Sequence, residues 1–555
     1  MRRATIGLAI ALAVSSGTSF ASGNMPSDAS NGAVAPEPPR EFVDTTMGPS
    51  SGRTLTVKAG GDFQEALDEA QLGDVIVLQA GASFTGPFSL PNKKYGTGWI
   101  TIRSSVVDNF PALGTRVSPA QAPLMALLTS RRGNGVVIAE KGAHHYRFIG
   151  IEVRPQEGSY LFSLMWFGNN RERSLEELPH HIIVDRCYIH GDPKKGSRRG
   201  ISMNGRHVAV IDSYISDFKD EREDSQAILG WGGSGPFKIV NNYLEGAGEN
   251  LMFGGGDPLI QNLVPSDIEI RRNYMAKPLS WKRDEPSFDG SSWTIKNIFE
   301  LKNARRVWFD GNVLEYNWEA SQSGFAVLLT VRNQEGRAPW SAVEDVQFTN
   351  NIIRHSGSGI ALMGHDNNRA WNESVETKRI LIKNNVWEDI GGPRWGGRGI
   401  LFQLVEGTSD VAIEGNTGRQ TGSLVFALGP PHKRFVFRNN MAPHNEFGIF
   451  GNAVGVGSKA LEAYFPDAVV VGNIIAGGDK RQYPEGNLFP SSLDAATLSP
   501  QHNAAFRLAK ATQDKSSGML PTDAGVKIKE LCLALGPHSD REPMCRADAA
   551  DVHGR

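Results

Sequence analysis

Short stretches in which apolar and polar residues alternate recur along most of this 555-residue chain. The two-residue period is that of a β-strand with one buried face. In ten places such a stretch leads into a small or polar residue and a further apolar step, as in IIVDRCYIHG, VQFTNNIIRH and ILIKNNVWED. The residue at this bend is Cys187, Ser213, Asn242, Asn273, Asn312, Asn351, Asn385, Asn416, Asn440 or Asn473.

The spacing between successive bends varies from 24 to 39 residues, while the strand unit stays constant. This combination is typical of a solenoid whose insertions lie in its turns. A second apolar run follows each bend, as in GISMNG, NIFELKN and GIALMGHD. The 62 Gly and 30 Pro favour turns over long helices. We therefore predict an all-β fold over residues 53–490, a right-handed parallel β-helix with two or three strands per coil.

The asparagines at the bends have a structural explanation. Asn tolerates unusual backbone angles, and its amide can bond to the same amide in the next coil. We therefore expect a ladder of amides along the solenoid rather than catalytic asparagines. Ser213 and Cys187 are small enough to occupy the first rungs.

Both ends of the solenoid are expected to be covered. In AGGDFQEALDEAQLGDVIVLQ, residues 59–79, Phe63, Ala66, Leu67 and Ala70 recur at helical spacing before a strand, which predicts an N-terminal capping helix. Residues 491–555 are expected to form a C-terminal capping segment of loop and helix. Cys532 and Cys545 flank a short loop and are predicted to form a disulfide.

The entry segment GGDFQEALDEAQLGDVIVL and the Asn-rich coils resemble the pectate-lyase-like superfamily of right-handed parallel β-helix proteins. The resemblance covers about residues 53 to 480. It implies an exported protein that acts on polysaccharides, although a fold does not fix a function.

The first residues, MRRATIGLAIALAVSSGTSFASG, combine two arginines, a short apolar run and small residues before a cleavage position. We predict a signal peptide over residues 1–21 and a disordered linker over residues 22–52, so the protein is expected to be secreted or periplasmic. The alternative, a membrane anchor, needs a longer apolar run.

Net charge is −2, which argues against a general nucleic-acid binder. Residues 271–337 nevertheless hold eleven Lys and Arg against eight Asp and Glu, and nine of the eleven Trp lie between residues 231 and 395. Basic and aromatic side chains suit an anionic polysaccharide, whereas packed Trp and solvated charges are the alternative. We expect Trp281, Lys282, Trp318 and Arg305 to bind substrate, and we expect a monomer.

Candidate catalytic residues lie on three successive coils. In NIFELKN, Phe299 and Leu301 point inward, so Glu300 and Lys302 share the outer face about 6.6 Å apart. The next coils add Arg332 from VLLTVRN and His365 from IALMGHD. With coils about 4.8 Å apart, these four side chains are predicted to form one outward patch.

Lys302 and Arg332 are similar to the Lys and Arg pair of β-helix lyases of the alginate and chondroitin type, although the flanking acidic metal motif of those enzymes is not reproduced. This similarity implies a polysaccharide lyase that cleaves a uronate-containing chain by β-elimination. Glu249 and Asp257 are possible ligands for Ca²⁺.

Two other classes remain open. A glycoside hydrolase would pair Glu300 with Asp257 or Glu315, although the motifs of polygalacturonase-like enzymes are absent. A non-catalytic glycan-binding β-helix would share the same aromatic residues.

Overall fold

The computed structural model describes residues 32–131, 134–367, 373–493 and 524–546. The chain divides into two units, residues 1–31 and residues 32–555, and the second unit holds all of the described residues. The predicted signal peptide and, within the expected C-terminal capping segment, residues 494–523 and 547–555 lie outside the described residues.

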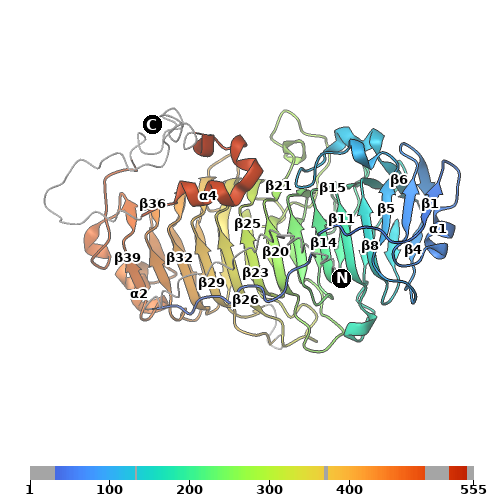
Figure 1. Ribbon diagram of the computed structural model, residues 1–555. Helices are drawn as coiled ribbons and strands as arrows, with labels where there is room; N and C mark the ends of the chain where they lie inside the picture. Colours follow the sequence, from blue (N-terminus) through green and yellow to red (C-terminus); the bar gives the residue numbers. More distant parts are fainter. Residues whose placement is uncertain (1–31, 132–133, 368–372, 494–523, 547–555) are drawn as a thin grey trace, which may run out of the picture. The chain divides into compact units, whose positions relative to one another are not determined.

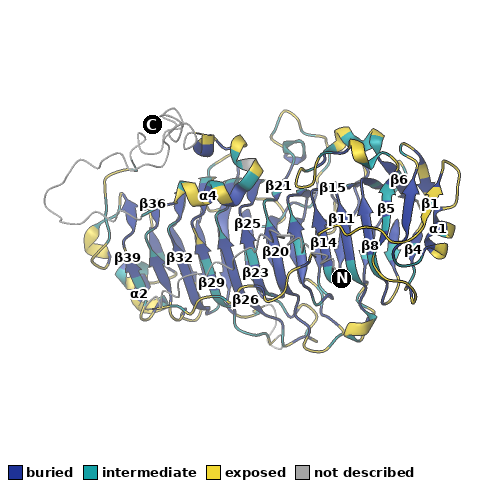
Figure 2. Ribbon diagram, viewed as in Figure 1, coloured by how far each residue is buried: buried dark blue, intermediate teal, exposed yellow. Residues whose placement is uncertain are grey.

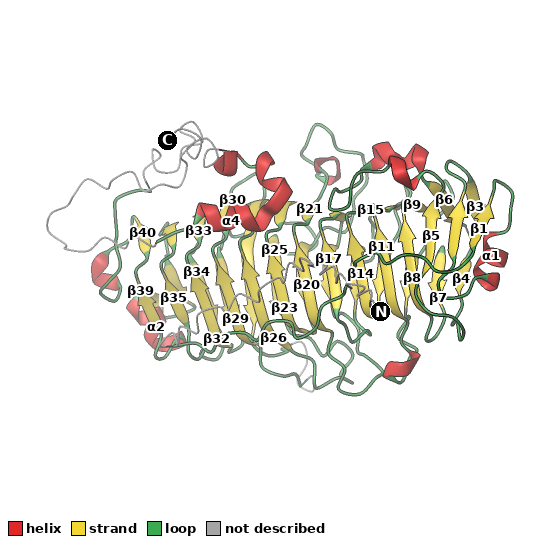
Figure 3. Ribbon diagram, in the orientation of Figure 1, coloured by secondary structure: helices red, strands yellow, loops and turns green. Residues whose placement is uncertain are grey.

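Three sheets, built almost wholly from parallel strands, make up the second unit (Figures 1 and 3). Each coil of the chain adds one strand to sheet 1, then one to sheet 2, then one to sheet 3, so neighbours within a sheet belong to successive coils. This topology confirms the predicted fold class, an all-β right-handed parallel β-helix. Helices are few and short (Figure 3).

Sheet 1 contains β1 (Thr54–Val57), β2 (Val75–Leu78), β5 (Ile100–Ser104), β8 (His144–Ile149), β11 (His180–Asp185), β14 (Arg206–Ile211), β17 (Phe237–Val240), β20 (Ser266–Arg271), β23 (Ala304–Asp310), β26 (Val343–Thr349), β29 (Lys378–Lys383), β32 (Ser409–Glu414), β35 (Val436–Arg438) and β39 (Val469–Val471). Sheet 2 contains β3 (Ser83–Thr85), β6 (Ala126–Ser130), β9 (Ile151–Pro155), β12 (Tyr188–His190), β15 (Tyr214–Phe218), β18 (Tyr243–Gly246), β21 (Tyr274–Ala276), β24 (Val313–Asn317), β27 (Ile352–Ser356), β30 (Val386–Ile390), β33 (Thr417–Gln420), β36 (Met441–Pro443) and β40 (Ile474–Ala476). Sheet 3 contains β4 (Phe88–Leu90), β7 (Val137–Ala139), β10 (Ser163–Phe167), β13 (Arg199–Met203), β16 (Gln226–Gly230), β19 (Glu249–Phe253), β22 (Asn297–Leu301), β25 (Phe325–Thr330), β28 (Ser358–Met363), β31 (Phe402–Val405), β34 (Val425–Leu428), β37 (Ile449–Gly451) and the antiparallel β38 (Gly455–Val456).

A single apolar core runs between the three sheets, and the strands are buried along most of their length (Figure 2). Phe299, Leu301, Val307 and Phe309 are 0% exposed, as the alternation in the sequence predicts. Aromatic rings stack from coil to coil inside this core, for example Phe309 on Phe348 at 4.8 Å between ring centroids.

The predicted amide ladder is present. The Oδ1 atom of Asn351 accepts hydrogen bonds from the backbone N and the Nδ2 of Asn312, at 2.9 and 3.1 Å. Asn351 in turn donates from both groups to Oδ1 of Asn385. The same arrangement extends through Asn242, Asn273, Asn416, Asn440 and Asn473 to a further rung at Asn487. Ser213 and Cys187 occupy the first rungs, and the Cys187 thiol is free and buried.

Two helices close the ends of the coil stack. α1 (Phe63–Glu69) begins at Asp62, whose side chain accepts a hydrogen bond from the Glu65 backbone N, and it buries Phe63 and Leu67, as the sequence predicts. At the other end α2 (Ser458–Tyr464) buries Ala460 and Leu461 against the last coils. The sequence analysis does not identify α2, which is only seven residues long.

The C-terminal segment packs on the outside of sheet 2. Leu531 and Leu535 of α4 (Ile528–Leu535) contact a buried cluster that includes Val313 and Ile352. Cys532 and Cys545 form the predicted disulfide. The short 3-10 helices are η1 (Val107–Asn109), η2 (Pro119–Leu124), η3 (Leu175–Glu177), η4 (Leu279–Trp281), η5 (Lys480–Gln482) and η6 (Gly536–Arg541).

A column of alternating acid and base lies at the start of the sheet 1 strands, one residue per coil. The parallel register aligns the six residues of this charged column, which are Asp267, Arg306, Asp345, Arg379, Asp410 and Arg434. All six have a left-handed backbone, with φ between 52° and 60°. Each arginine donates two hydrogen bonds to the aspartate of the coil before it, at 2.5–2.8 Å. These bidentate ion pairs offset the strain of a left-handed backbone at a non-glycine residue.

Residues 32–50, here called the strap, lie extended across sheet 1 (dark blue in Figure 1). The backbone N atoms of Val34, Glu37 and Arg40 donate to Asp410, Asp345 and Asp267 of the charged column at 2.8–3.0 Å. Three residues of polyproline II chain span about 9.3 Å, close to the roughly 9.6 Å of two coils. The strap and the aspartates therefore share one period, and the linker expected over residues 22–52 is an ordered strap over 32–50.

Candidate functional site

The outer surface of sheet 3 between β13 and β25, here called the site face, carries the predicted catalytic residues Glu300, Lys302 and Arg332. Because Phe299 and Leu301 are buried in the core, Glu300 between them points outward. The parallel register places Gln226, Glu249 and Asn297 in one row, and Met252 beside Glu300 in the next.

Glu249 is fully buried on this face, beneath its neighbours. Its Oε2 accepts a hydrogen bond of 2.7 Å from Nε2 of Gln226, and its Oε1 lies 3.7 Å from Nζ of Lys296. Burial and the nearby Glu300 carboxylate raise the pKa of Glu249 to about 7. A carboxyl group with this pKa exchanges protons near neutral pH.

Lys296 lies between two acidic side chains, Asp224 and Glu249. Its Nζ lies 2.6 Å from Asp224 Oδ2. Burial alone would lower the pKa of Lys296, but Glu249 and Asp224 outweigh it and the pKa is raised. Lys296 is therefore held as a cation at neutral pH.

Lys277 lies underneath this face and is 0% exposed. Its Nζ contacts five acceptors, among them the carbonyl oxygens of Gly246, Ala247 and Asn297. Burial lowers the pKa of Lys277 to about 7 against the attraction of Glu249. This lysine fixes the turn that leads into β19 and so positions Glu249.

The four predicted catalytic residues lie on successive coils. Lys302 Nζ is 3.6 Å from Glu300 Oε1, and the Lys302 side chain is 14% exposed. The backbone N of Arg332 donates to the Lys302 carbonyl oxygen, so the two residues are neighbours across one coil step. The Arg332 guanidinium turns toward the next coil and bonds to Asp366 at 2.8 Å, where the adjacent His365 is exposed. Glu300 itself is only 2% exposed, so it lies beneath the surface of the patch.

Cationic and aromatic side chains extend the site face toward the N-terminal coils. Arg199 lies over the rings of Phe162 and Trp231, at 4.7 and 5.3 Å from their centroids, and bonds to Gln226. Burial and the neighbouring Arg198 lower the pKa of Arg199 to about 10, which leaves it charged at neutral pH. Sequence reasoning missed both residues: Arg199 is far from the Glu300 segment in the chain, and Lys296, four residues before Glu300, lies in the turn ahead of β22, where strand alternation does not fix the direction of a side chain.

A pocket of about 510 Å³ opens at the turn between sheets 2 and 3. Trp281, Trp293, Trp318 and Trp395 line it and pack into one cluster, each 7% exposed or less. The structure therefore brings the predicted residues Trp281, Lys282 and Trp318 together. The four Trp rings pack against one another at the base of the pocket, so they are not free to stack on a sugar. The rim of the pocket is charged and contains Lys282, Arg283, Asp284, Glu319 and Arg394.

Other predicted residues are far from this region. Arg305 lies on β23 of sheet 1, where it bonds to Ser266 Oγ at 2.9 Å. Glu315 lies on β24 of sheet 2 and pairs with Arg354, so it does not face Glu300. Asp257 follows the end of β19 whereas Glu249 begins it, and Asp257 accepts backbone hydrogen bonds from Glu335 and Arg337.

The structure does not bring together Glu249 and Asp257, the two acids expected to bind Ca²⁺. Ca²⁺ takes six to eight oxygen ligands, but Lys296 and Lys302 already lie against Glu249 and Glu300. Asp257 is at the opposite end of β19 from Glu249, so the two acids expected to share a cation are separated along the strand. Over the described residues, only His145, His180 and His181 bring three potential ligand atoms of His, Cys, Asp or Glu within 4.8 Å of one another.

No protein-family model matches the sequence, and no curated protein matches it. A variant of a PL6 family alginate lyase is similar at 13% identity and a TM-score of 0.47, over 88% of this chain and 58% of that chain. A mannuronic acid specific polysaccharide family 6 lyase from human gut microbiota is similar at 11% identity and a TM-score of 0.45, over 90% and 100%. An E. coli bacteriophage tailspike variant in complex with a pentasaccharide is similar at 11% identity and a TM-score of 0.44, over 78% and 64%.

The described residues include no helix long and apolar enough to cross a membrane. The class that the fold and the site define is a right-handed parallel β-helix with a charged site face on sheet 3.

Proposed function

We propose that this protein is an exported lyase that binds an anionic, uronate-containing polysaccharide on the site face and cleaves it by β-elimination. The observation that carries the proposal is the position of Lys302, which lies against Glu300 and one coil from Arg332 on the outer surface of sheet 3. Both basic side chains are partly exposed, at 14% and 26%, so a substrate can reach them.

β-Elimination needs three events at a uronate residue. A cation must stabilise the negative charge that moves onto the carboxylate, a base must remove the proton from C5, and the C4–O bond must break as the C4=C5 double bond forms. The departing oxygen then takes up a proton. The product carries an unsaturated uronate at its new non-reducing end.

The residues of the site face fit these roles. Lys302 takes the C5 proton, and Arg332 binds the uronate carboxylate from the neighbouring coil. Lys296 and Arg199 add positive charge beside them. The pocket over the Trp cluster has a charged rim and is large enough to hold other sugar residues of the same polysaccharide.

A glycoside hydrolase is the second candidate, favoured by Glu249 and Glu300. A carboxyl group whose pKa is raised to about 7 beside another carboxylate is the arrangement that hydrolases use for general acid catalysis. In that case Glu249 would protonate the leaving oxygen.

One assay separates the candidates. The purified full chain is incubated with alginate, pectate and glycosaminoglycans while ultraviolet absorbance and reducing ends are both recorded. A lyase raises both signals, whereas a hydrolase raises only the reducing ends. Retained polysaccharide binding with neither signal would leave a non-catalytic binding protein and overturn the proposal.

Variants test the named residues. Lys302→Ala and Arg332→Ala are expected to lower the rate at least a hundredfold while the protein stays folded, because both side chains point outward. Lys383→Ala, at an exposed position on sheet 1, is the matched control and should keep wild-type activity. Wild-type rates in Lys302→Ala would remove the lysine from the mechanism.

A further inference from the structure

Five histidines lie together at the start of three neighbouring strands of sheet 1, away from the site face. His144 and His145 begin β8, His180 and His181 begin β11, and His207 is in β14. Their rings stack from coil to coil. His145 stacks on His181 at 4.5 Å between centroids and 4° between planes, and His181 stacks on His207 at 4.4 Å and 7°.

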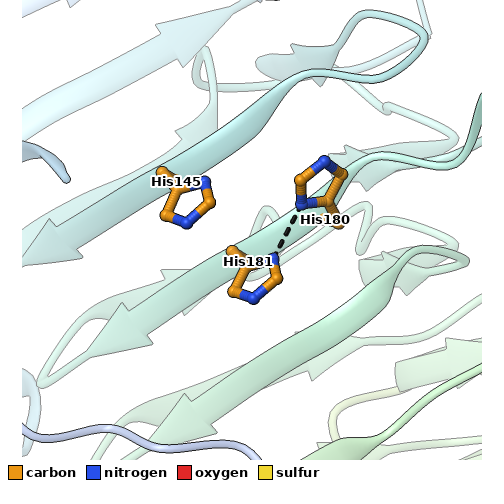
Figure 4. Close-up of side chains that lie close together, drawn as sticks. All are labelled: His145, His180 and His181. Carbon is orange, nitrogen blue, oxygen red and sulfur yellow. Dashed lines mark hydrogen bonds between the residues drawn. The ribbon is translucent and has the colours of Figure 1, made fainter. Parts of the chain in front are cut away.

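The ring nitrogens converge between the coils. His180 and His181 place their Nδ1 atoms 2.7 Å apart, and His144 and His145 place theirs 2.8 Å apart. His145, His180 and His181 each offer one nitrogen to a group whose members all lie within 4.8 Å (Figure 4). Three nitrogens around a tetrahedral metal ion, each about 2.0–2.1 Å from it, stand roughly 3.4 Å apart. Small side-chain rotations therefore suffice to reach that geometry.

The backbone fixes the direction of these rings. His145 and His181 have left-handed backbones, with φ of 58° and 54°, which project both side chains outward from the same edge of the sheet. Trp99 packs edge-on against both rings, at 5.2 and 6.3 Å between centroids. All three potential ligands are half-buried, so each imidazole is packed by its neighbours and still partly exposed.

Imidazole is the commonest metal ligand in proteins, and each ring can offer the lone pair of its unprotonated nitrogen to a cation. His207 adds a buried Nδ1 with no hydrogen-bond partner within the described part of the chain.

We propose that His145, His180 and His181 bind a divalent transition metal ion, which links the coil of β8 to the coil of β11. Three imidazole ligands favour Zn²⁺, Cu²⁺ or Ni²⁺ over Ca²⁺ or Mg²⁺, which prefer oxygen. The fourth position is left to water. The site is independent of the proposed lyase activity, because it lies on sheet 1 rather than sheet 3.

The test uses the untagged full chain, stripped with chelator and titrated calorimetrically with Zn²⁺. We expect one ion per chain, no heat with Ca²⁺, and a higher melting temperature with Zn²⁺ bound. X-ray absorption should show nitrogen ligands at about 2.0–2.1 Å. Absence of Zn²⁺ binding at micromolar concentration would mean that the rings only stack, and would overturn the proposal.

His145→Asn and His181→Asn remove one ligand each while keeping a residue that tolerates the left-handed backbone. Each is expected to weaken Zn²⁺ binding at least tenfold. His355→Asn is the matched control, because His355 also has a positive φ, of 59°, and stacks on Tyr316 outside the cluster. Equal affinity in His181→Asn and wild type would contradict the site even if some Zn²⁺ binds.

Discussion

The amide ladder makes each bend asparagine depend on the coils on both sides of it. Asn351 exchanges side-chain hydrogen bonds with Asn312 and Asn385 and is 0% exposed. The Asn351 side chain therefore both hydrogen-bonds to the two neighbouring coils and fills the space between them. Its removal leaves unpaired polar groups in two coils at once, in a region that water does not reach.

Asn351→Leu is expected to lower the free energy of unfolding by about 1–3 kcal/mol, because buried donors and acceptors lose their partners. Thermal or denaturant unfolding measures the change. Asn452→Leu, at an exposed position, should have little effect. Equal melting curves for wild type and Asn351→Leu would count against the ladder.

His432 gives the stability a defined pH dependence. It is 1% exposed, accepts a hydrogen bond of 3.0 Å from the Thr408 backbone N, and stacks on Phe465. Burial lowers its pKa from 6.5 to about 4. Between these values the unfolded chain takes up a proton that the folded chain does not, so stability is lost as pH falls through this range.

Below pH 4, the proton uptake that His432 undergoes on unfolding lowers the free energy of unfolding by up to about 3 kcal/mol. His432→Gln should therefore flatten the dependence of the melting temperature on pH between 6.5 and 4, whatever its effect at neutral pH. Parallel curves for the variant and wild type would show that His432 does not titrate in this way.

Among the elements, the strap depends on long-range contacts most directly. It has no strand pairing of its own, and its backbone is held by three aspartates that are themselves paired with arginines. Pro36, Pro38 and Pro39 restrict the unbound segment to extended conformations, which lowers the entropy cost of docking.

Asp345→Ala removes both the acceptor for the Glu37 backbone N and the partner of Arg379. We expect a loss of about 2 kcal/mol in stability and faster hydrogen exchange and proteolysis within residues 34–42. The control is Asp389→Ala, which removes a half-exposed carboxylate that pairs with His355. Unchanged exchange in the strap would show that Asp345 does not anchor it.

The disulfide holds the C-terminal element on sheet 2. Cys532 and Cys545 are 13 residues apart, and a loop of this size contributes about 3 kcal/mol. Cys532→Ser with Cys545→Ser should therefore release residues 526–546 to exchange before the coils unfold. A reducing agent should reproduce this effect in the wild type, since Cys187 forms no disulfide.

At the scale of the whole molecule, net charge and local charge differ. The chain carries −2 overall, yet Arg199, Lys296, Lys302 and Arg332 lie on one face of sheet 3. Interaction with an anionic polymer therefore depends on this face rather than on the total charge.

If the site face binds uronate chains, retention of the protein on immobilised alginate or pectate should fall steeply between 0.1 M and 1 M salt. The screening length drops over this range from about 10 Å to about 3 Å. Lys302→Glu should weaken retention further, and Lys383→Glu on sheet 1 should not. Equal retention at both salt concentrations would mean that charge does not drive binding.

Much of the fold follows from the sequence because its signals are local. Alternation identifies the strands and places Phe299 and Leu301 inside, and the recurring Asn identifies the rungs. The strap could not be identified in this way, because residues 32–50 have no apolar–polar periodicity. The aspartates that bind Val34, Glu37 and Arg40 lie more than 200 residues away in the chain.

The candidate site was predictable only in part. Glu300, Lys302 and Arg332 follow from strand parity and coil order. The contact of Lys296 with Glu249 depends on a turn packed around the buried Lys277, which no local pattern reveals. The histidine cluster does have a sequence signal, because the doublet HH occurs at residues 144–145 and again at residues 180–181.

The charged column also constrains how such a chain can change length during evolution. From Asp267 to Arg434 each acidic coil needs a basic coil after it, and each pair of coils matches three residues of the strap. Losing or duplicating one coil would set like charges against each other and shift every later strap contact out of phase. Duplications and deletions that are tolerated in this region should therefore add or remove coils two at a time.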